Sequence, residues 1–145
     1  MLNKTTKPTT SGEIKRAWHM IDVKDKTLGR ISTEIAKLLM GKSKTYFARN
    51  LDCGDYVVIV NAKEVKVSGN KEAQKKYYRY SGYPSGLSIR TLANVRKQDA
   101  REIITHAVKG MLPQNRLRDS MLTRLFIYTD EKHPYEDKFK VQSAK

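Results

Sequence analysis

The chain has little cysteine, few acidic residues and no long apolar run. Its single cysteine, Cys53, excludes an internal disulfide framework and a thiolate-only zinc cluster. No apolar run approaches the roughly 20 residues that a membrane-spanning helix needs. The N-terminal run MLNKTTKPTT also lacks the apolar segment of a secretory signal. These absences predict a soluble protein of a reducing compartment.

Basic residues greatly outnumber acidic ones. The sequence holds 29 Lys and Arg against 15 Asp and Glu, a formal net charge of +14, and its pI is near 9.9. This balance favours a polyanionic partner, either a nucleic acid or an acidic membrane surface. Residues 62–97 hold nine cationic and two acidic side chains, half of the excess. A membrane favours a basic amphipathic helix, whereas the charge here surrounds a tyrosine-rich segment interrupted by Gly82, Pro84 and Gly86, which favours RNA.

The 145 residues are 39% hydrophobic, too apolar for a disordered basic tail and enough for a buried core. Residues 1–16 are polar and aperiodic, which predicts an extended N-terminal arm. Residues 17–129 carry the apolar periodicity of one domain. Residues 130–145 are again polar and predict a C-terminal tail.

The first half of the domain has the pattern of a βαβ unit. Residues 18–23 predict a strand, and apolar side chains from Leu28 to Leu39 recur at helical spacing. Gly41 is placed to end that helix. Residues 56–60 are apolar throughout, as in a parallel strand covered on both faces. The order strand, helix, buried strand therefore predicts an α/β fold.

The second half is more varied. Residues 70–88 show no usable period and predict a long basic loop, a kind of segment that is usually functional or disordered. Asp99 is placed to cap a helix that Pro113 stops. The predicted helices cover 91–97, 99–111 and 115–124, and the predicted strands cover 65–67 and 125–128.

The strongest candidate for a binding site lies in the predicted loop. Four of the eight tyrosines fall between residues 77 and 83, among several cations. Cations pair with phosphates, and tyrosine rings stack on bases or riboses. The alternative is that the rings pack beneath the loop while the cations are merely solvated. The residues predicted to bind RNA here are Lys71, Lys75, Lys76, Tyr77, Tyr78, Arg79, Tyr80, Ser81, Gly82, Tyr83 and Arg90.

Two further sets of cations are candidates for phosphate contacts. Lys42, Lys44 and Arg49 follow the first helix, where cations also complement the helix dipole. The second set surrounds the turn at residues 110–113, and arginines suit phosphate forks although they also form solvated helix faces. Its members are Lys109, Arg116, Arg118 and Arg124.

Signals for catalysis are weak. The run Thr27–Arg30 lies between strand and helix but has one glycine in place of the G-x-G-x-x-G of a dinucleotide loop. Asp52 and Asp55 could share a Mg²⁺ ion as in a nuclease, or could form a turn around Cys53 and Gly54. The three histidines lack metal-ligand spacing. The sequence therefore predicts no enzyme, no metal site and no cofactor.

Six short motifs occur in order over roughly residues 16–136: Asp25–Arg30, Asp52–Asp55, Tyr78–Pro84, Val108–Pro113, Asn115–Leu117 and His133–Pro134. Together they resemble the bacterial-type large-subunit ribosomal protein L13 family. The sequence departs from the family at Tyr80, usually His, at Ser85, usually Gly, and at Ser88, usually Lys. In addition, Arg118-Asp119 replaces a usual Gly-Arg.

The resemblance implies a three-layer α/β/α domain around a mostly parallel four-stranded sheet. It also implies a structural constituent of the large ribosomal subunit that binds large-subunit ribosomal RNA, supports assembly and touches neighbouring ribosomal proteins. Such a protein has no membrane partner and no small-molecule substrate, and it acts in the ribosome, in the cytoplasm or in an organelle. Two alternatives are a free-standing regulatory protein that binds messenger RNA and a Mg²⁺-dependent nuclease.

Overall fold

A computed structural model describes residues 8–140 of the chain. Residues 1–7 of the predicted arm and 141–145 of the predicted tail lie outside the described residues. Of the arm, residues 8–16 include a short 3-10 helix, η1 (Ser11–Glu13).

Three parallel strands form the central sheet of the described chain, in the order β1-β2-β5. They are β1 (Trp18–Asp22), β2 (Tyr56–Val60) and β5 (Leu125–Ile127). Helix α1 (Leu28–Met40) connects β1 to β2, so the predicted βαβ unit is confirmed.

The implied fourth strand is not part of this sheet within residues 8–140. Residues 65–67, predicted as a short strand, contribute one isolated parallel bridge between Thr27 and Lys66. Just before them Asn61 takes a left-handed backbone (φ +60°), and the 3-10 helix η2 (Ala62–Glu64) turns the chain out of the sheet direction. The pairing stops after one bridge because its partner Thr27 stands directly before helix α1.

The two faces of the sheet are covered differently. On one face α1 and α4 (Ala100–Met111) pack together over a core that includes Val57 and Ile59 of β2. On the other face the rings of Trp18 and Tyr56 stack with centroids 4.4 Å apart. The short helix α6 (Glu136–Lys140), within the predicted polar tail, contacts β1 there and covers this face only in part.

Two glycines fasten the loop between α1 and β2 to the end of α1. Gly41 ends α1 with φ +74°, which confirms the predicted helix end. A Cβ at Gly41 would lie 2.4 Å from the Cys53 carbonyl oxygen, and one at Gly54 would lie 1.7 Å from the Leu39 carbonyl oxygen. Backbone touches backbone at both points, so side chains are excluded.

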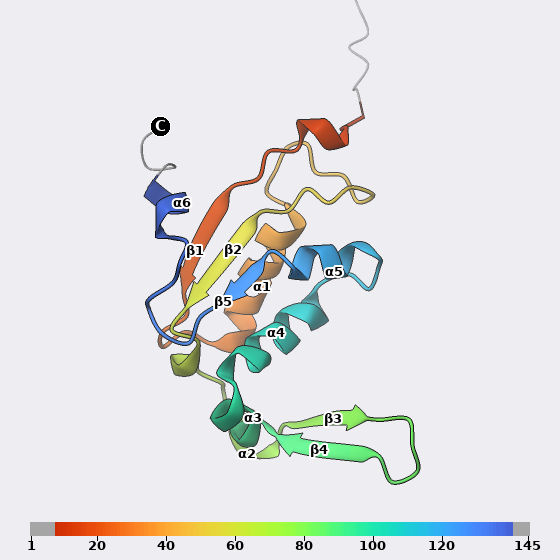
Figure 1. Cartoon of the computed structure of the whole chain (residues 1–145), viewed down its shortest axis with the longest axis vertical. Coiled ribbons are helices and arrows are strands. Elements are labelled where there is room, and N and C mark those ends of the chain that lie inside the picture. The colour runs from red at the N-terminus through yellow and green to blue at the C-terminus, as the bar shows by residue number, and fades with distance from the viewer. Residues whose placement is uncertain (1–7, 141–145) are drawn as a thin grey trace, which may run out of the picture.

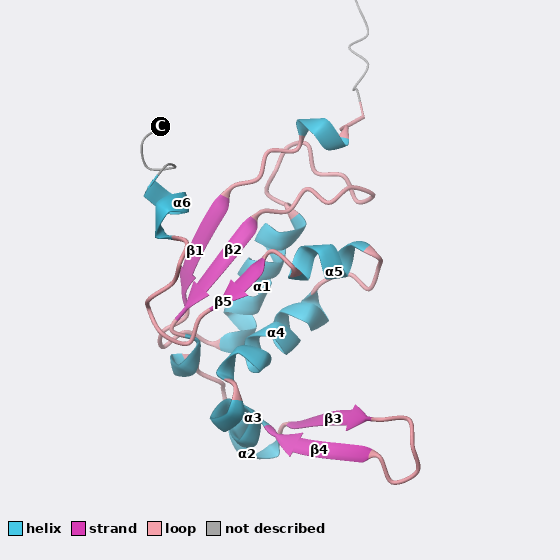
Figure 2. Cartoon of the chain, in the orientation of Figure 1, coloured by secondary structure: helices cyan, strands magenta, loops and turns pink. Residues whose placement is uncertain are grey.

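The predicted long loop at residues 70–88 is wrong, because most of it is regular structure. It contains the short helix α2 (Lys71–Gln74) and an antiparallel hairpin of β3 (Lys76–Tyr80) and β4 (Leu87–Thr91). Figure 2 shows the hairpin projecting from the domain, away from the central sheet. Both faces of β3 carry tyrosine, so the alternation of apolar and polar residues that marks a half-buried strand is missing.

Helix α3 (Leu92–Gln98) follows the hairpin directly and packs on α4. Asp99 caps α4 as predicted, accepting a hydrogen bond from the amide of Arg101 at 2.9 Å. The last helix before β5 is α5 (Leu117–Leu122), which is shorter than predicted.

We expect Gly54→Ala to lower the free energy of unfolding by about 3 kcal/mol, because its methyl group would collide with the Leu39 carbonyl and force backbone to move. Urea unfolding followed by circular dichroism measures this loss. The matched control is Gly12→Ala in η1, where a Cβ meets no atom within 4 Å. A change at Gly54 as small as that of the control would contradict the close backbone contact.

Candidate nucleic-acid interface

One face of the hairpin exposes apolar side chains. The register pairs Tyr78 with Ile89 and Tyr80 with Leu87, which places all four on the same face. These side chains are between 51% and 66% exposed. Leu87 and Ile89 were not predicted as site residues, although their alternation in sequence is a strand signal. Large side chains this exposed, grouped on one projecting element, mark an interaction surface.

The opposite face anchors the hairpin to the domain through Tyr77. Its ring lies 5.3 Å from the imidazole of His106 on α4, and the Lys75 ammonium lies 5.4 Å from the ring centroid. Burial, assisted by the charge of Glu102, raises the pKa of the Tyr77 phenol above its ordinary value. Tyr77 is thus a packing residue, which agrees for this one ring with the alternative of tyrosines packed beneath the segment.

The tip of the hairpin is a tight six-residue loop, Ser81–Gly86. The Gly86 amide donates to the Tyr83 carbonyl at 2.9 Å, and the Tyr83 side chain is 75% exposed. Gly82 has φ +90° and Ser85 has φ +62°. Ser85 therefore occupies a left-handed position that favours glycine, the residue usual in the family that the motifs resemble.

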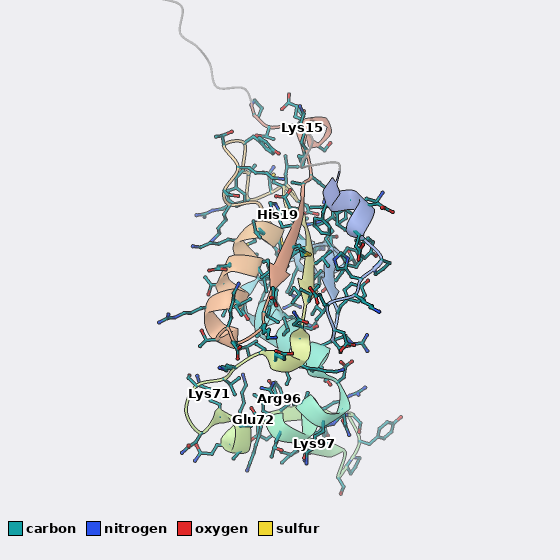
Figure 3. All side chains as sticks on the ribbon, turned by 90° about the vertical axis from the view of Figure 1, so that its left-hand side faces the viewer. Lys15, His19, Lys71, Glu72, Arg96 and Lys97 are labelled. Atoms are coloured by element: carbon teal, nitrogen blue, oxygen red, sulfur yellow. The ribbon has the colours of Figure 1, made fainter. Side chains whose placement is uncertain are left out.

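An arginine at the base of the hairpin also connects it to the rest of the domain. Arg96 of α3 donates to both carboxylate oxygens of Glu72, at 2.8 and 3.1 Å. Its remaining nitrogen donates to the carbonyls of Val65 at 2.9 Å and Lys63 at 3.1 Å. Figure 3 shows Arg96 and Glu72 beside each other at this end of the molecule. The sequence held no signal for this role, because the contacts come from three separate segments.

The structure does not bring the three predicted sets of cations together. Lys71, Lys75, Lys76 and Arg79 lie on or next to the hairpin and are exposed. Arg90 of β4 is half-buried and donates to Gln98 at 3.2 Å. The hairpin and the loop after α1 lie at opposite ends of the molecule (Figure 1).

The cations outside the hairpin differ in exposure. Lys42 and Arg49 in the loop after α1 are exposed, as are Lys109 and Arg116 around the turn between α4 and α5. Arg118 is half-buried, with its Nε 3.9 Å from a carboxylate oxygen of Asp119.

Two predicted phosphate contacts, Lys44 and Arg124, need revision. The Lys44 ammonium donates to the carbonyls of Lys15 at 2.7 Å and Cys53 at 2.9 Å, and to the carboxylate of Asp55. These contacts use all three of its protons. Arg124 is buried and forms a bidentate pair with Asp52. Both cations hold the fold together, so neither is available to a phosphate.

The two acids considered for a Mg²⁺ ion are occupied by these cations. Asp55 is buried, and its Oδ2 lies 3.1 Å from His19 Nε2 while its Oδ1 accepts from the Ala17 amide at 2.8 Å. Burial alone would raise the pKa of Asp55, but the hydrogen bonds from His19, Lys44 and Ala17 lower it below the ordinary value. Asp52 is neutralised by Arg124, so the pair serves structure.

Residues 8–140 hold no group of three or more His, Cys, Asp or Glu side chains placed to bind a metal ion. They also hold no helix with the length and apolarity to span a membrane.

The fold and the hairpin define a class: a small basic α/β domain with a projecting, tyrosine-rich hairpin. The family model of ribosomal protein L13 matches residues 16–134, and the chain belongs to this family. The resemblance drawn from the motifs is thereby confirmed.

Curated relatives agree with this assignment. The large ribosomal subunit protein uL13 of Dehalococcoides mccartyi (strain 195) is 51% identical over 125 residues, which cover 86% of this chain and 87% of that protein. The uL13 of Aquifex aeolicus is 47% identical over 124 residues, 86% of each chain. That of Synechococcus sp. is 42% identical over 134 residues, 92% of this chain and 89% of that protein.

We expect Asp55→Asn to lower the free energy of unfolding at pH 7 by about 3–5 kcal/mol, because it leaves the Lys44 ammonium buried without its counter-ion. Since folding lowers the pKa of this carboxyl, its contribution is present above about pH 4, its ordinary pKa, and is lost as the pH falls through the folded value. Urea unfolding between pH 7 and pH 3 tests both statements.

The control for this experiment is Asp119→Asn, whose carboxylate is 82% exposed. A stability difference at Asp55 that stays constant down to pH 3 would contradict the assigned pKa shift.

Proposed function

We propose that this chain is a structural, non-catalytic constituent of the large ribosomal subunit, which binds large-subunit ribosomal RNA, contacts neighbouring ribosomal proteins and supports assembly. Membership of the L13 family and the relatives' names support it. The observation that carries the RNA contact is the projecting hairpin, in which exposed tyrosines and exposed cations lie together. The site of action is the ribosome.

The hairpin binds RNA with two kinds of side chain. Lys75, Lys76 and Arg79 pair with phosphates, and this sequence-independent attraction supplies most of the affinity. Tyr78, Tyr80 and Tyr83 stack on unpaired bases or pack on riboses. The loop residues Ser81 and Gly82 let the tip approach the RNA backbone. Other exposed cations add separate phosphate contacts, and these are Lys42, Lys71, Arg49, Lys109 and Arg116.

The two alternative functions fit the geometry less well. A nuclease needs Asp52 and Asp55 free for Mg²⁺, whereas Arg124 and Lys44 occupy them. A free-standing regulatory protein would not stay with the ribosome. Co-sedimentation of the tagged chain with intact large subunits at physiological salt separates the two possibilities, and its presence only in the free fraction would overturn the proposal.

We expect the triple change Lys75→Ala, Lys76→Ala and Arg79→Ala to weaken binding to a bacterial large-subunit RNA transcript. Because each lost phosphate contact removes about 0.7–0.9 from the slope of log K against log salt concentration, the slope should become shallower by about 2–3. Filter binding over a series of salt concentrations measures both quantities.

The matched control removes the same charge elsewhere, through Lys24→Ala, Lys132→Ala and Lys138→Ala, all exposed cations outside the hairpin. Equal losses in the two triple variants would show that the hairpin is not the main contact.

A further inference from the structure

A cleft of about 1270 Å³ lies between the first turn of α1, the last turn of α4 and the segment at residues 67–75. This is larger than the roughly 300–1,000 Å³ of pockets that enclose small molecules. Its size fits a segment of a polymer better than an enclosed metabolite. Lys71, one of its lining residues, lies at the same end of the molecule as Arg96 and Glu72 (Figure 3).

The lining of the cleft combines cations with apolar side chains. Arg30, Lys71 and Lys75 line the cleft, and none of the lining residues carries a carboxylate. The lining also includes Leu28 and Met111, and the Met111 side chain is 41% exposed although it belongs to a helix. Cations and apolar side chains in one cleft suit a nucleotide unit, whose base or ribose is flat and whose phosphate is charged.

Two glycines in this lining have no structural explanation within the fold. Gly29 lies in α1 and Gly110 in α4, and both helices are regular there. A Cβ at either position meets no atom within 4 Å, and neither residue has a positive φ. Gly29 is the second residue of α1 and Gly110 the last but one of α4, and the fold leaves room for a side chain at both positions. Gly41 and Gly54 differ, because there neighbouring backbone excludes a Cβ.

We propose that this cleft is a second RNA-binding site, which adjoins the base of the hairpin and shares Lys75 with it, and in which Gly29 and Gly110 let the backbone of an RNA strand approach the two helices. Arg30, Lys71 and Lys75 bind its phosphates, and Met111 with Leu28 contacts the ribose or base. This inference rests on the proposed function. It also assigns a role to the run Thr27–Arg30, whose single glycine is too few for a dinucleotide loop.

The test places side chains in the cleft without harming the helices. The double variant Gly29→Leu, Gly110→Leu should have a Tm equal to or above that of the unchanged protein, because leucine is a better helix former than glycine. Its affinity for a full-length bacterial large-subunit RNA transcript should fall at least tenfold, which at about 1.4 kcal/mol per factor of ten equals the loss of one good contact. Gly12→Leu, in open space in η1, is the matched control.

A second variant tests the charge. Arg30→Gln should make the salt dependence of RNA binding shallower by about one phosphate contact, with no change in Tm.

The outcomes separate this inference from the proposed function. If the unchanged protein fails to bind the transcript, the proposed function fails. If it binds and the hairpin variant is weakened, but the leucine variant binds as tightly as Gly12→Leu, only the cleft site is overturned. A lower Tm in the leucine variant would show that the glycines serve the fold, which also overturns the inference. Unchanged RNA binding with loss of co-sedimentation would assign the cleft to a protein partner and overturn it as well.

Discussion

The carboxylates of Asp52 and Asp55 hold together the end of the molecule where all three parallel strands begin. Asp55 accepts from Ala17 and His19 at the start of β1 and pairs with Lys44 in the loop after α1. Asp52 pairs with Arg124, directly before β5. The two acids stand immediately before β2. A buried ion pair contributes little net stability by itself, but loss of one partner leaves an uncompensated charge, so these contacts specify which segments meet.

These ion pairs lie at the end of the molecule opposite the hairpin, which is the element proposed to bind RNA. The hairpin follows α2 and precedes α3 in the chain. It contacts the domain through the Tyr77 ring, and the hydrogen bonds of the Arg96 guanidinium hold its base. An anchored base and an exposed tip suit the proposed RNA contact, because the cations proposed to pair with phosphates remain in solvent. The cleft between α1 and α4 adjoins the base of the hairpin, since Lys71 and Lys75 line the cleft and belong to the segment that leads into β3.

Sequence patterns predicted α1 and the three parallel strands. The first helix shows an apolar stripe at helical spacing, and the uniformly apolar, β-branched run at residues 56–60 is typical of a buried strand. The hairpin was missed because β3 carries tyrosine on both faces, although Leu87 and Ile89 of β4 alternate as in a strand. The implied fourth strand is reduced to one bridge because Thr27, the partner of Lys66, stands directly before α1.

The sequence by itself determined the basic character, the L13 family and the candidates for RNA contact, because charge and motif order are properties of the chain alone. Only the tertiary structure decided which cations are free. Lys42 and Lys44 are two residues apart and both are predicted from the sequence to contact phosphate. In the structure Lys42 is exposed, whereas the Lys44 ammonium is hydrogen-bonded to backbone carbonyls and paired with Asp55. Arg116 and Arg124 differ in the same way, because Arg116 is exposed whereas Arg124 is buried and paired with Asp52. A cation's exposure depends on the acid that folding brings beside it: Asp55 lies 11 residues from Lys44 in the chain, and Asp52 lies 72 residues from Arg124.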